Sequence, residues 1–232
     1  RVRGGTLGTL ETVDSDRIFG GGKGRSTSIN GNASIYINDR KNNLTIYGNT
    51  FGGSEAGGVA GNSIVTMEDR YVSANSITYS GIIFGGGKGV GATATNGANS
   101  TVIVDGGTYQ GLTIFGGCDI SGTIEGNILV KVGEKNTTKV GSVYGAGRNS
   151  RVTNVTESVY VHCYNNAMVY ENVFNGGMNA GIDGTNPRAV YINGATVLQN
   201  VYGGSDSSGA LQFTNVYCFN GASVSGSVFG AG

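Results

Sequence analysis

The chain has 232 residues, of which 44 are glycine, one is proline and 38% are hydrophobic. Fifteen basic residues balance fifteen acidic ones, which leaves no basic stripe to neutralise phosphates and excludes nucleic acid as an expected partner. No apolar run reaches 18 residues, so we expect no membrane insertion.

From one end of the chain to the other, a short motif returns eight times: an aliphatic or threonine residue, an aromatic residue, then a glycine-rich corner. Consecutive aromatic residues are 27 to 33 positions apart. A period of this size, built from short apolar runs and glycines, is typical of a solenoid in which each repeat forms one coil. The aromatic residues are Phe19, Phe51, Phe84, Phe115, Tyr144, Phe174, Tyr202 and Phe229.

A second segment precedes most of these aromatic residues and reads apolar, variable, apolar, which indicates a half-buried β-strand. Its copies are Ile35–Ile37, Val65–Met67, Val102–Val104, Val130–Val132, Val159–Val161, Val190–Ile192 and Val216–Cys218. Lys131 occupies the middle position of one copy and must reach solvent, so the middle residues are expected to face outward. The tyrosines that this alignment places outside are Tyr36, Tyr160, Tyr191 and Tyr217. The last three fall on consecutive coils and are expected to form a ladder.

Between the two segments lie corners with the sequence Asn193-Gly194, Asn220-Gly221 or Asp105-Gly106. Glycine there supplies the positive φ of a sharp turn. Such dipeptides also mark β-hairpins, but a hairpin stack would not need the same residue type every 30 residues or so, whereas stacked coils do. We therefore expect an all-β fold, a right-handed parallel β-helix (β-solenoid) of seven to eight coils, each about 27–33 residues long.

The coils are expected to form a single domain over residues 1–232, either as a segment of a longer array, which we favour, or as a unit that stacks into a fibre. Both ends of the sequence match the interior of the repeat, and a solenoid with uncapped ends tends to associate. The recurrent aromatic residue has two possible orientations. We favour a stack in the core, with a surface stripe as the alternative.

The repeat, as in Asn200–Gly204 and Ser227–Ala231, resembles glycine-rich, adhesin-like parallel β-helix surface proteins of bacteria. The resemblance covers essentially the whole chain and implies an extracellular or cell-surface rod. It carries over no catalytic residue.

Three groups of residues are candidates for chemistry. Gly20–Gly24 and Gly85–Gly89 resemble phosphate loops, but no helix follows and glycine replaces the required Ser or Thr. Single aspartates near glycine corners, which are calcium candidates, are Asp119, Asp183 and Asp206. Carboxylates at the ends of equivalent strands, which suit acid–base chemistry on sugars, are Asp39, Glu68, Asp69 and Asp105. We interpret all three groups as corner residues, and we expect no cofactor, no metal and no enzymatic activity.

Two functional hypotheses remain. The first is a structural or adhesive extracellular rod whose partners are itself, by lateral or end-to-end stacking, or further repeats of the same chain. The second is a glycan-binding or polysaccharide-processing β-helix whose partners are surface glycans. A flat wall lined by Tyr36, Tyr160, Tyr191 and Tyr217 favours the first, and a cleft with an acidic pair favours the second.

Overall fold

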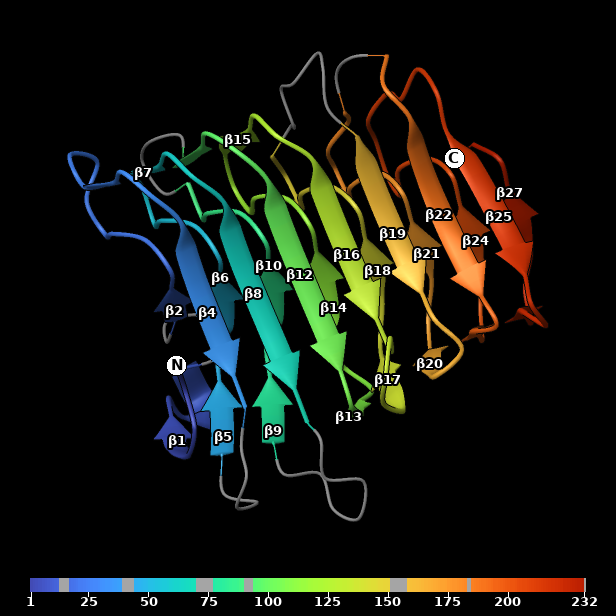
Figure 1. Ribbon diagram of the computed structural model, residues 1–232, viewed down its shortest axis with the longest axis horizontal. Helices are drawn as coiled ribbons and strands as arrows, with labels where there is room; N and C mark the ends of the chain where they lie inside the picture. The colour runs from blue at the N-terminus through green and yellow to red at the C-terminus, as the bar shows by residue number, and fades with distance from the viewer. Residues whose placement is uncertain are drawn as a thin grey trace.

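The computed structural model describes residues 1–12, 17–38, 44–69, 77–89, 94–150, 158–182 and 185–231. These ranges hold 27 β-strands, a single 3-10 helix, η1 (Leu10–Thr12), and no α-helix. Every strand pair in them is parallel. Strands stack side by side along the long axis, from the N-terminal to the C-terminal end (Figure 1). The protein is a parallel β-solenoid, as the repeat predicts; the hand and the number of coils stay predictions.

The face at the front of Figure 1 is a seven-stranded sheet that we call the front sheet. It contains the predicted apolar–variable–apolar segments. In the first five of these strands the inward-facing residues are buried and the outward-facing ones are mostly half-buried, as strand periodicity requires. The last strand, at the edge of the sheet, is largely exposed. The strands are β4 (Ala33–Ile37), β8 (Ser63–Glu68), β12 (Ser100–Asp105), β16 (Ile128–Val132), β19 (Val159–Cys163), β22 (Arg188–Asn193) and β25 (Asn215–Phe219).

An eight-stranded back sheet carries the repeated aromatic motif. Each of its strands ends on the aromatic residue, and the glycine corner follows. A Cβ added at Gly116 in one such corner would overlap the carbonyl oxygen of Gly145 on the next coil, so the stacking leaves no room for a side chain. The strands are β2 (Arg17–Phe19), β6 (Asn49–Phe51), β10 (Ile82–Phe84), β14 (Thr113–Phe115), β18 (Val143–Tyr144), β21 (Val173–Phe174), β24 (Val201–Tyr202) and β27 (Val228–Phe229).

Three shorter sheets close the coil. Two of them form the lower face. The first contains β1 (Gly5–Leu7), β5 (Leu44–Tyr47) and β9 (Ile77–Ser80). The second contains β13 (Gly107–Tyr109), β17 (Thr138–Val140), β20 (Ala167–Val169), β23 (Thr196–Val197) and β26 (Ser223–Val224). The upper sheet contains β3 (Ser28–Ile29), β7 (Gly58–Val59), β11 (Ala94–Asn96) and β15 (Gly122–Ile124). The predicted corner glycines do adopt positive φ, with 92° at Gly106, 70° at Gly194 and 78° at Gly221.

The main core is aliphatic and lies between the sheets. It includes the residue before each aromatic residue in the middle coils, such as Ile83 and Ile114, both fully buried. Asparagine side chains tie successive coils together at a corner. The backbone N–H groups of Asn62, Asn99 and Asn127 donate to the side-chain oxygens of Asn32, Asn62 and Asn99, at 2.8, 3.1 and 2.8 Å. These bonds satisfy backbone donors that a corner would otherwise leave without partners.

The repeated aromatic residues stack into one continuous column. Neighbouring ring centroids are 4.5–5.1 Å apart and their planes differ by 1–14°. Ile83 faces the main core, so Phe84, the next residue of the same strand, points to the opposite side, yet it is fully buried. The favoured inward orientation is therefore wrong, because the preceding residue faces the main core instead. The middle rings are nevertheless buried, as a second core outside the back sheet that is separate from the aliphatic one. We call these eight residues the aromatic column.

Candidate interaction surface

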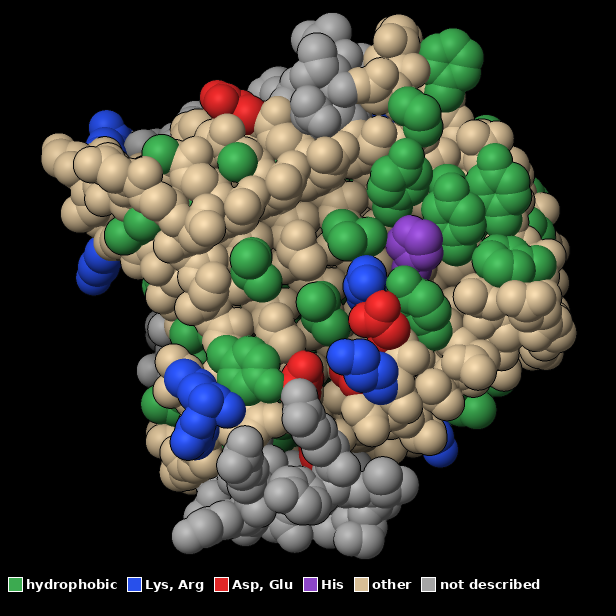
Figure 2. Space-filling model, in the orientation of Figure 1, with side chains coloured by type: hydrophobic (Ala, Val, Ile, Leu, Met, Phe, Trp, Pro, Cys, Tyr) green, Lys and Arg blue, Asp and Glu red, His purple; other side chains and the backbone are tan. Residues whose placement is uncertain are grey.

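The outer face of the front sheet is the surface that the sequence singles out. Register aligns one outward residue from each strand into a row that we call the outer column: Tyr36, Thr66, Ile103, Lys131, His162, Tyr191 and Tyr217. Figure 2 shows this face. Hydrophobic side chains gather towards its C-terminal half around the histidine, and the nearby lysine and acidic side chains lie closer to its middle.

One predicted member of the tyrosine ladder takes a different place. His162, not Tyr160, pairs with Lys131 and with Tyr191. Tyr160 lies two residues earlier, beside Leu129 and Ala189. The predicted alignment is therefore corrected by two residues on this coil. The physical reason is that a period-2 pattern looks the same after a shift of two, and β19 offers three inward residues that fit either alignment.

The corrected cluster, which we call the aromatic patch, contains Tyr160, His162, Tyr164, Tyr191 and Tyr217. The His162 ring stacks on that of Tyr191, with centroids 4.5 Å apart and planes 11° apart, and on that of Tyr164 at 5.8 Å and 17°. Tyr191 in turn stacks on Tyr217 at 5.0 Å and 13°. Tyr160 is tilted by 52° from Tyr191 and meets His162 edge-on at 62°.

This geometry determines what the patch presents to a partner. The faces of His162 and Tyr191 are covered by neighbouring rings, so these two rings present chiefly their edges to solvent. Tyr217, which is 45% exposed, stacks on Tyr191 alone. A sugar that stacks on an aromatic ring needs a free ring face, whereas a packed protein surface is satisfied by edges and hydroxyls. The patch therefore fits protein contact better than sugar stacking.

Charge near the patch is low and largely paired. Lys131 Nζ lies 2.9 Å from Glu134 Oε1, and this hydrogen bond raises the pKa of the lysine. Burial, followed by the positive charge of Lys131, lowers the pKa of His162 below 6.5. At neutral pH the histidine is therefore an uncharged member of the stack.

Tyr36 lies apart from the other three predicted tyrosines. It belongs to β4, the edge strand at the far end of the front sheet from Tyr217. Its hydroxyl donates to the Glu68 carboxylate, and the Arg1 guanidinium carbon lies 4.8 Å from the centre of its ring. A hollow of about 410 Å³ is lined by Arg1 and Tyr36. The four tyrosines of the predicted surface therefore do not lie together: Tyr36 lies at one end of the front sheet, and the other three lie in the aromatic patch.

The carboxylates that suggested acid–base chemistry are used locally. Asp105 accepts the backbone N–H groups of Lys135 and Asn136 at 2.9 and 3.0 Å and the Asn136 side-chain amide at 2.7 Å. Asp69 is buried and accepts the Tyr109 hydroxyl at 3.3 Å. Asp39 lies outside the described residues, as does Asp183. In the part of the chain that the structure describes, no group of three or more His, Cys, Asp or Glu side chains could hold a metal ion.

A second row of side chains, which was not expected from the sequence, follows the glycine corners. Backbone bonds of the parallel type link these loop segments from coil to coil; Lys88 N donates to Ser54 O at 2.9 Å and Gly89 N to Glu55 O at 2.7 Å, which aligns Lys88 with Glu55. Equivalent bonds continue along the solenoid. The aligned residues, which we call the loop column, are Lys23, Glu55, Lys88, Asp119, Arg148, Met178 and Asp206. Each lies four positions after a repeated aromatic residue, which is the signal that could have revealed them.

The loop column covers the outer side of the aromatic column. The Arg148 guanidinium carbon lies 5.5 Å from the centre of the Phe84 ring, two coils back, while its Nε donates to Asp119 Oδ1 at 2.7 Å. The Tyr144 hydroxyl donates to Asp206 Oδ2 at 3.0 Å, again across two coils. These contacts explain why rings that point away from the main core are buried. They also give the Asp119 and Asp206 side chains a structural role within the fold, in place of the calcium chemistry considered above.

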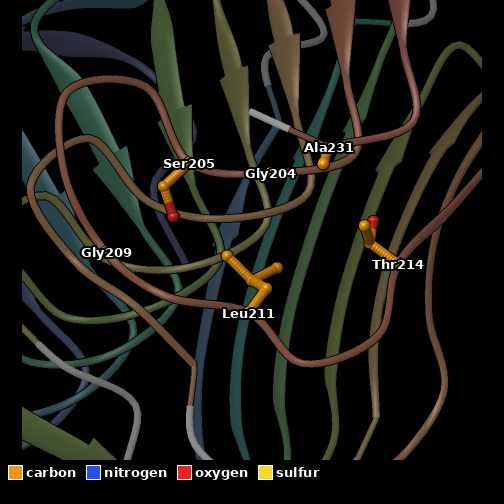
Figure 3. A pocket seen from close by; sticks show the side chains of 6 residues that line it. All are labelled: Gly204, Ser205, Gly209, Leu211, Thr214 and Ala231. Carbon is orange, nitrogen blue, oxygen red and sulfur yellow. The ribbon is translucent and has the colours of Figure 1, made fainter.

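A small hollow opens near the C-terminal end of the loops. It has a volume of about 50 Å³ and is lined by Gly204, Ser205, Gly209, Leu211, Thr214 and Ala231 (Figure 3). Sites for small molecules usually enclose about 300–1,000 Å³. The Ser205 hydroxyl already donates to the carbonyl oxygen of Ala180 at 3.0 Å. This hollow is therefore a packing gap and no ligand site.

The described residues form a parallel β-solenoid with an aromatic patch on the outer face of its front sheet. No protein-family model, curated protein or solved structure matches the chain. Among the described residues, the structure has no helix long and apolar enough to cross a membrane.

Proposed function

We propose that the protein is a structural or adhesive extracellular β-solenoid, a rod or fibre segment that acts by lateral or end-to-end association and not as an enzyme. One observation supports this most strongly: the aromatic patch lies on the outer face of the front sheet and offers ring edges and hydroxyls. Such a surface packs well against another protein surface. The partners would be further copies of this chain or further repeats of the same array.

A glycan-binding or polysaccharide-processing role is the alternative, and no observation favours it. Stacked rings leave few free faces for sugars, and the Asp105 carboxylate accepts three hydrogen bonds from its own turn. A general acid needs a carboxyl group within reach of a bound substrate. Among the carboxylates described here, Asp105 and Asp69 are already engaged within the fold.

The proposal is tested by removing the patch. In the double variant Tyr191→Ser/Tyr217→Ser, we expect concentration-dependent sedimentation and side-by-side bundles in negative-stain micrographs to be lost, because both members of one stacked pair are removed. Thr66→Ser, in the outer column but outside the patch, is the matched control and should associate like the wild type. Isolated rods for the wild-type chain, or bundles unchanged in the double variant, would refute the lateral role. Retardation of the wild type in gels containing xylan or pectin would support the alternative.

A further inference from the structure

The order of charges in the loop column is regular. From Lys23 to Arg148, five consecutive coils alternate in sign: Lys23, Glu55, Lys88, Asp119 and Arg148. Neighbouring residues lie about 4.8 Å apart along the stack. The three inner charges therefore have an opposite charge on both adjacent coils, and Lys23 and Arg148 have one on a single adjacent coil. Two of the five are strongly buried, with 8% of Lys88 and 1% of Asp119 exposed, so that water screens them poorly.

Three other columns of the solenoid, two in its interior and one at a corner, carry nearly the same residue type on successive coils and so distinguish one coil from another poorly. The aromatic column repeats Phe or Tyr, the main core repeats Val or Ile, and the corner repeats Asn on several successive coils. If a coil stacked on its second neighbour, with the intervening coil looped out, the residues of all three columns would still meet residues of their own type. Sequence-similar repeats therefore carry a risk of misordered stacking during folding.

The loop column does distinguish these arrangements. If the coil of Asp119 stacked directly on the coil of Glu55, two carboxylates would meet, and the same skip elsewhere would bring Lys88 against Lys23 or Arg148. Like charges placed directly opposite each other destabilise a sheet, and more so where they are shielded from solvent. Skipping one coil is thus penalised, while the correct order is favoured.

We propose that the loop column determines the order in which the coils stack. The alternating order of its charges, and not their number, makes each coil stack on the next coil in the sequence and not on the second one along. The loop column also holds the loops over the aromatic column, as the Arg148 contacts with Asp119 and Phe84 show. This inference concerns the order of coils within one chain and is independent of the lateral association proposed above.

A cysteine reporter can detect a skipped coil. Ile64 and Leu129 both face outward and both align with Thr101, which lies on the coil between them. In the correct order their Cα atoms are about 9.6 Å apart, twice the strand spacing, which is too far for a disulfide. If the intervening coil is skipped, they become neighbours. The reporter chain is I64C/L129C with Cys218→Ser to remove the exposed native thiol.

The decisive comparison keeps composition and changes order. Glu55→Lys/Lys88→Glu leaves the net charge unchanged but gives the order plus, plus, minus, minus, plus, and makes the skipped contact between position 55 and Asp119 attractive. Glu55→Asp/Lys88→Arg is the matched control, since it alters both side chains and keeps the alternation. Each reporter chain is refolded from urea at low concentration, oxidised, and analysed by mass spectrometry for the 64–129 disulfide.

We expect the exchanged chain to form this disulfide severalfold more than the control and the unexchanged reporter. Equal yields in the three chains would overturn the proposal. Failure of the exchanged chain to fold without forming the disulfide would also overturn it, because the proposal predicts misordered coils and not general unfolding. Neither result bears on bundling by the aromatic patch, so the two proposals fail separately.

Discussion

Replacing one ring in the middle of the aromatic column tests whether that column is a true second core. Phe84 is fully buried, stacks on Phe51 at 4.9 Å and on Phe115 at 5.1 Å, and lies under the guanidinium of Arg148. Phe84→Ala removes this buried surface and both stacked contacts, and leaves a cavity. Substitutions of this kind in a core cost about 3–5 kcal/mol, and we expect the free energy of unfolding to fall by that amount.

The matched control is Phe229→Ala at the C-terminal end of the same column. Phe229 is 43% exposed and stacks on a single ring, that of Tyr202, at 4.8 Å. Its removal loses part of one contact and creates no enclosed cavity, so we expect a loss of about 1 kcal/mol or less.

Urea unfolding followed by circular dichroism measures both variants, since each stability change appears as a shift of the midpoint at constant slope. A loss below about 1 kcal/mol for Phe84→Ala, or equal losses for the two variants, would refute the second core. The loops would then cover the rings without packing on them.

Three further outcomes are expected. Gly116→Ala should lower the free energy of unfolding in urea by about 1–3 kcal/mol, because the added Cβ would overlap the next coil. Gly111→Ala, with no atom within 4 Å of the added Cβ, should change it by about 0.5 kcal/mol or less, and equal effects of the two variants would contradict the stacking. Cys218 should react with a thiol reagent in the native protein while the two buried cysteines, whose pKa burial raises to about 12, stay unmodified until unfolding. NMR titration should give His162 a pKa below 6.5 in the folded protein. The unfolded chain then binds the proton more tightly, so this histidine makes the free energy of unfolding fall as the pH drops from about 6.5 to the lowered folded pKa. Lys131→Gln should raise the pKa of His162 but leave it below 6.5, because burial is the larger cause; an unchanged pKa would show that Lys131 is not a cause.

Much of the fold follows from the sequence because stacking forces equivalent residues to recur. The spacing of the aromatic residues predicts a solenoid, the period of two predicts the front-sheet strands, and the Asp-Gly and Asn-Gly dipeptides predict the corners at Gly106 and Gly194. The short upper sheet was not predicted, because two- and three-residue strands such as β3 (Ser28–Ile29) and β7 (Gly58–Val59) are too brief to show a period.

The candidate surface was predicted only in part. Outward orientation of Tyr191 and Tyr217 follows from the position of Lys131, and the two rings do stack. The place of Tyr160 does not follow from the sequence, since a shift of two leaves the strand pattern unchanged. His162, which takes the expected place of Tyr160, was overlooked for the same reason.

The contacts that reach across two coils set a minimum size for independent folding units. In a solenoid whose repeats touch only their nearest neighbours, unfolding can stop between any two repeats. Here Arg148 contacts Phe84, Asp206 accepts from Tyr144, and a bond of the same reach joins the Gln110 side chain to the Tyr170 hydroxyl. Each joins three successive coils, so unfolding between the coil of Phe84 and the coil of Asp206 should advance in blocks of three coils and not one coil at a time.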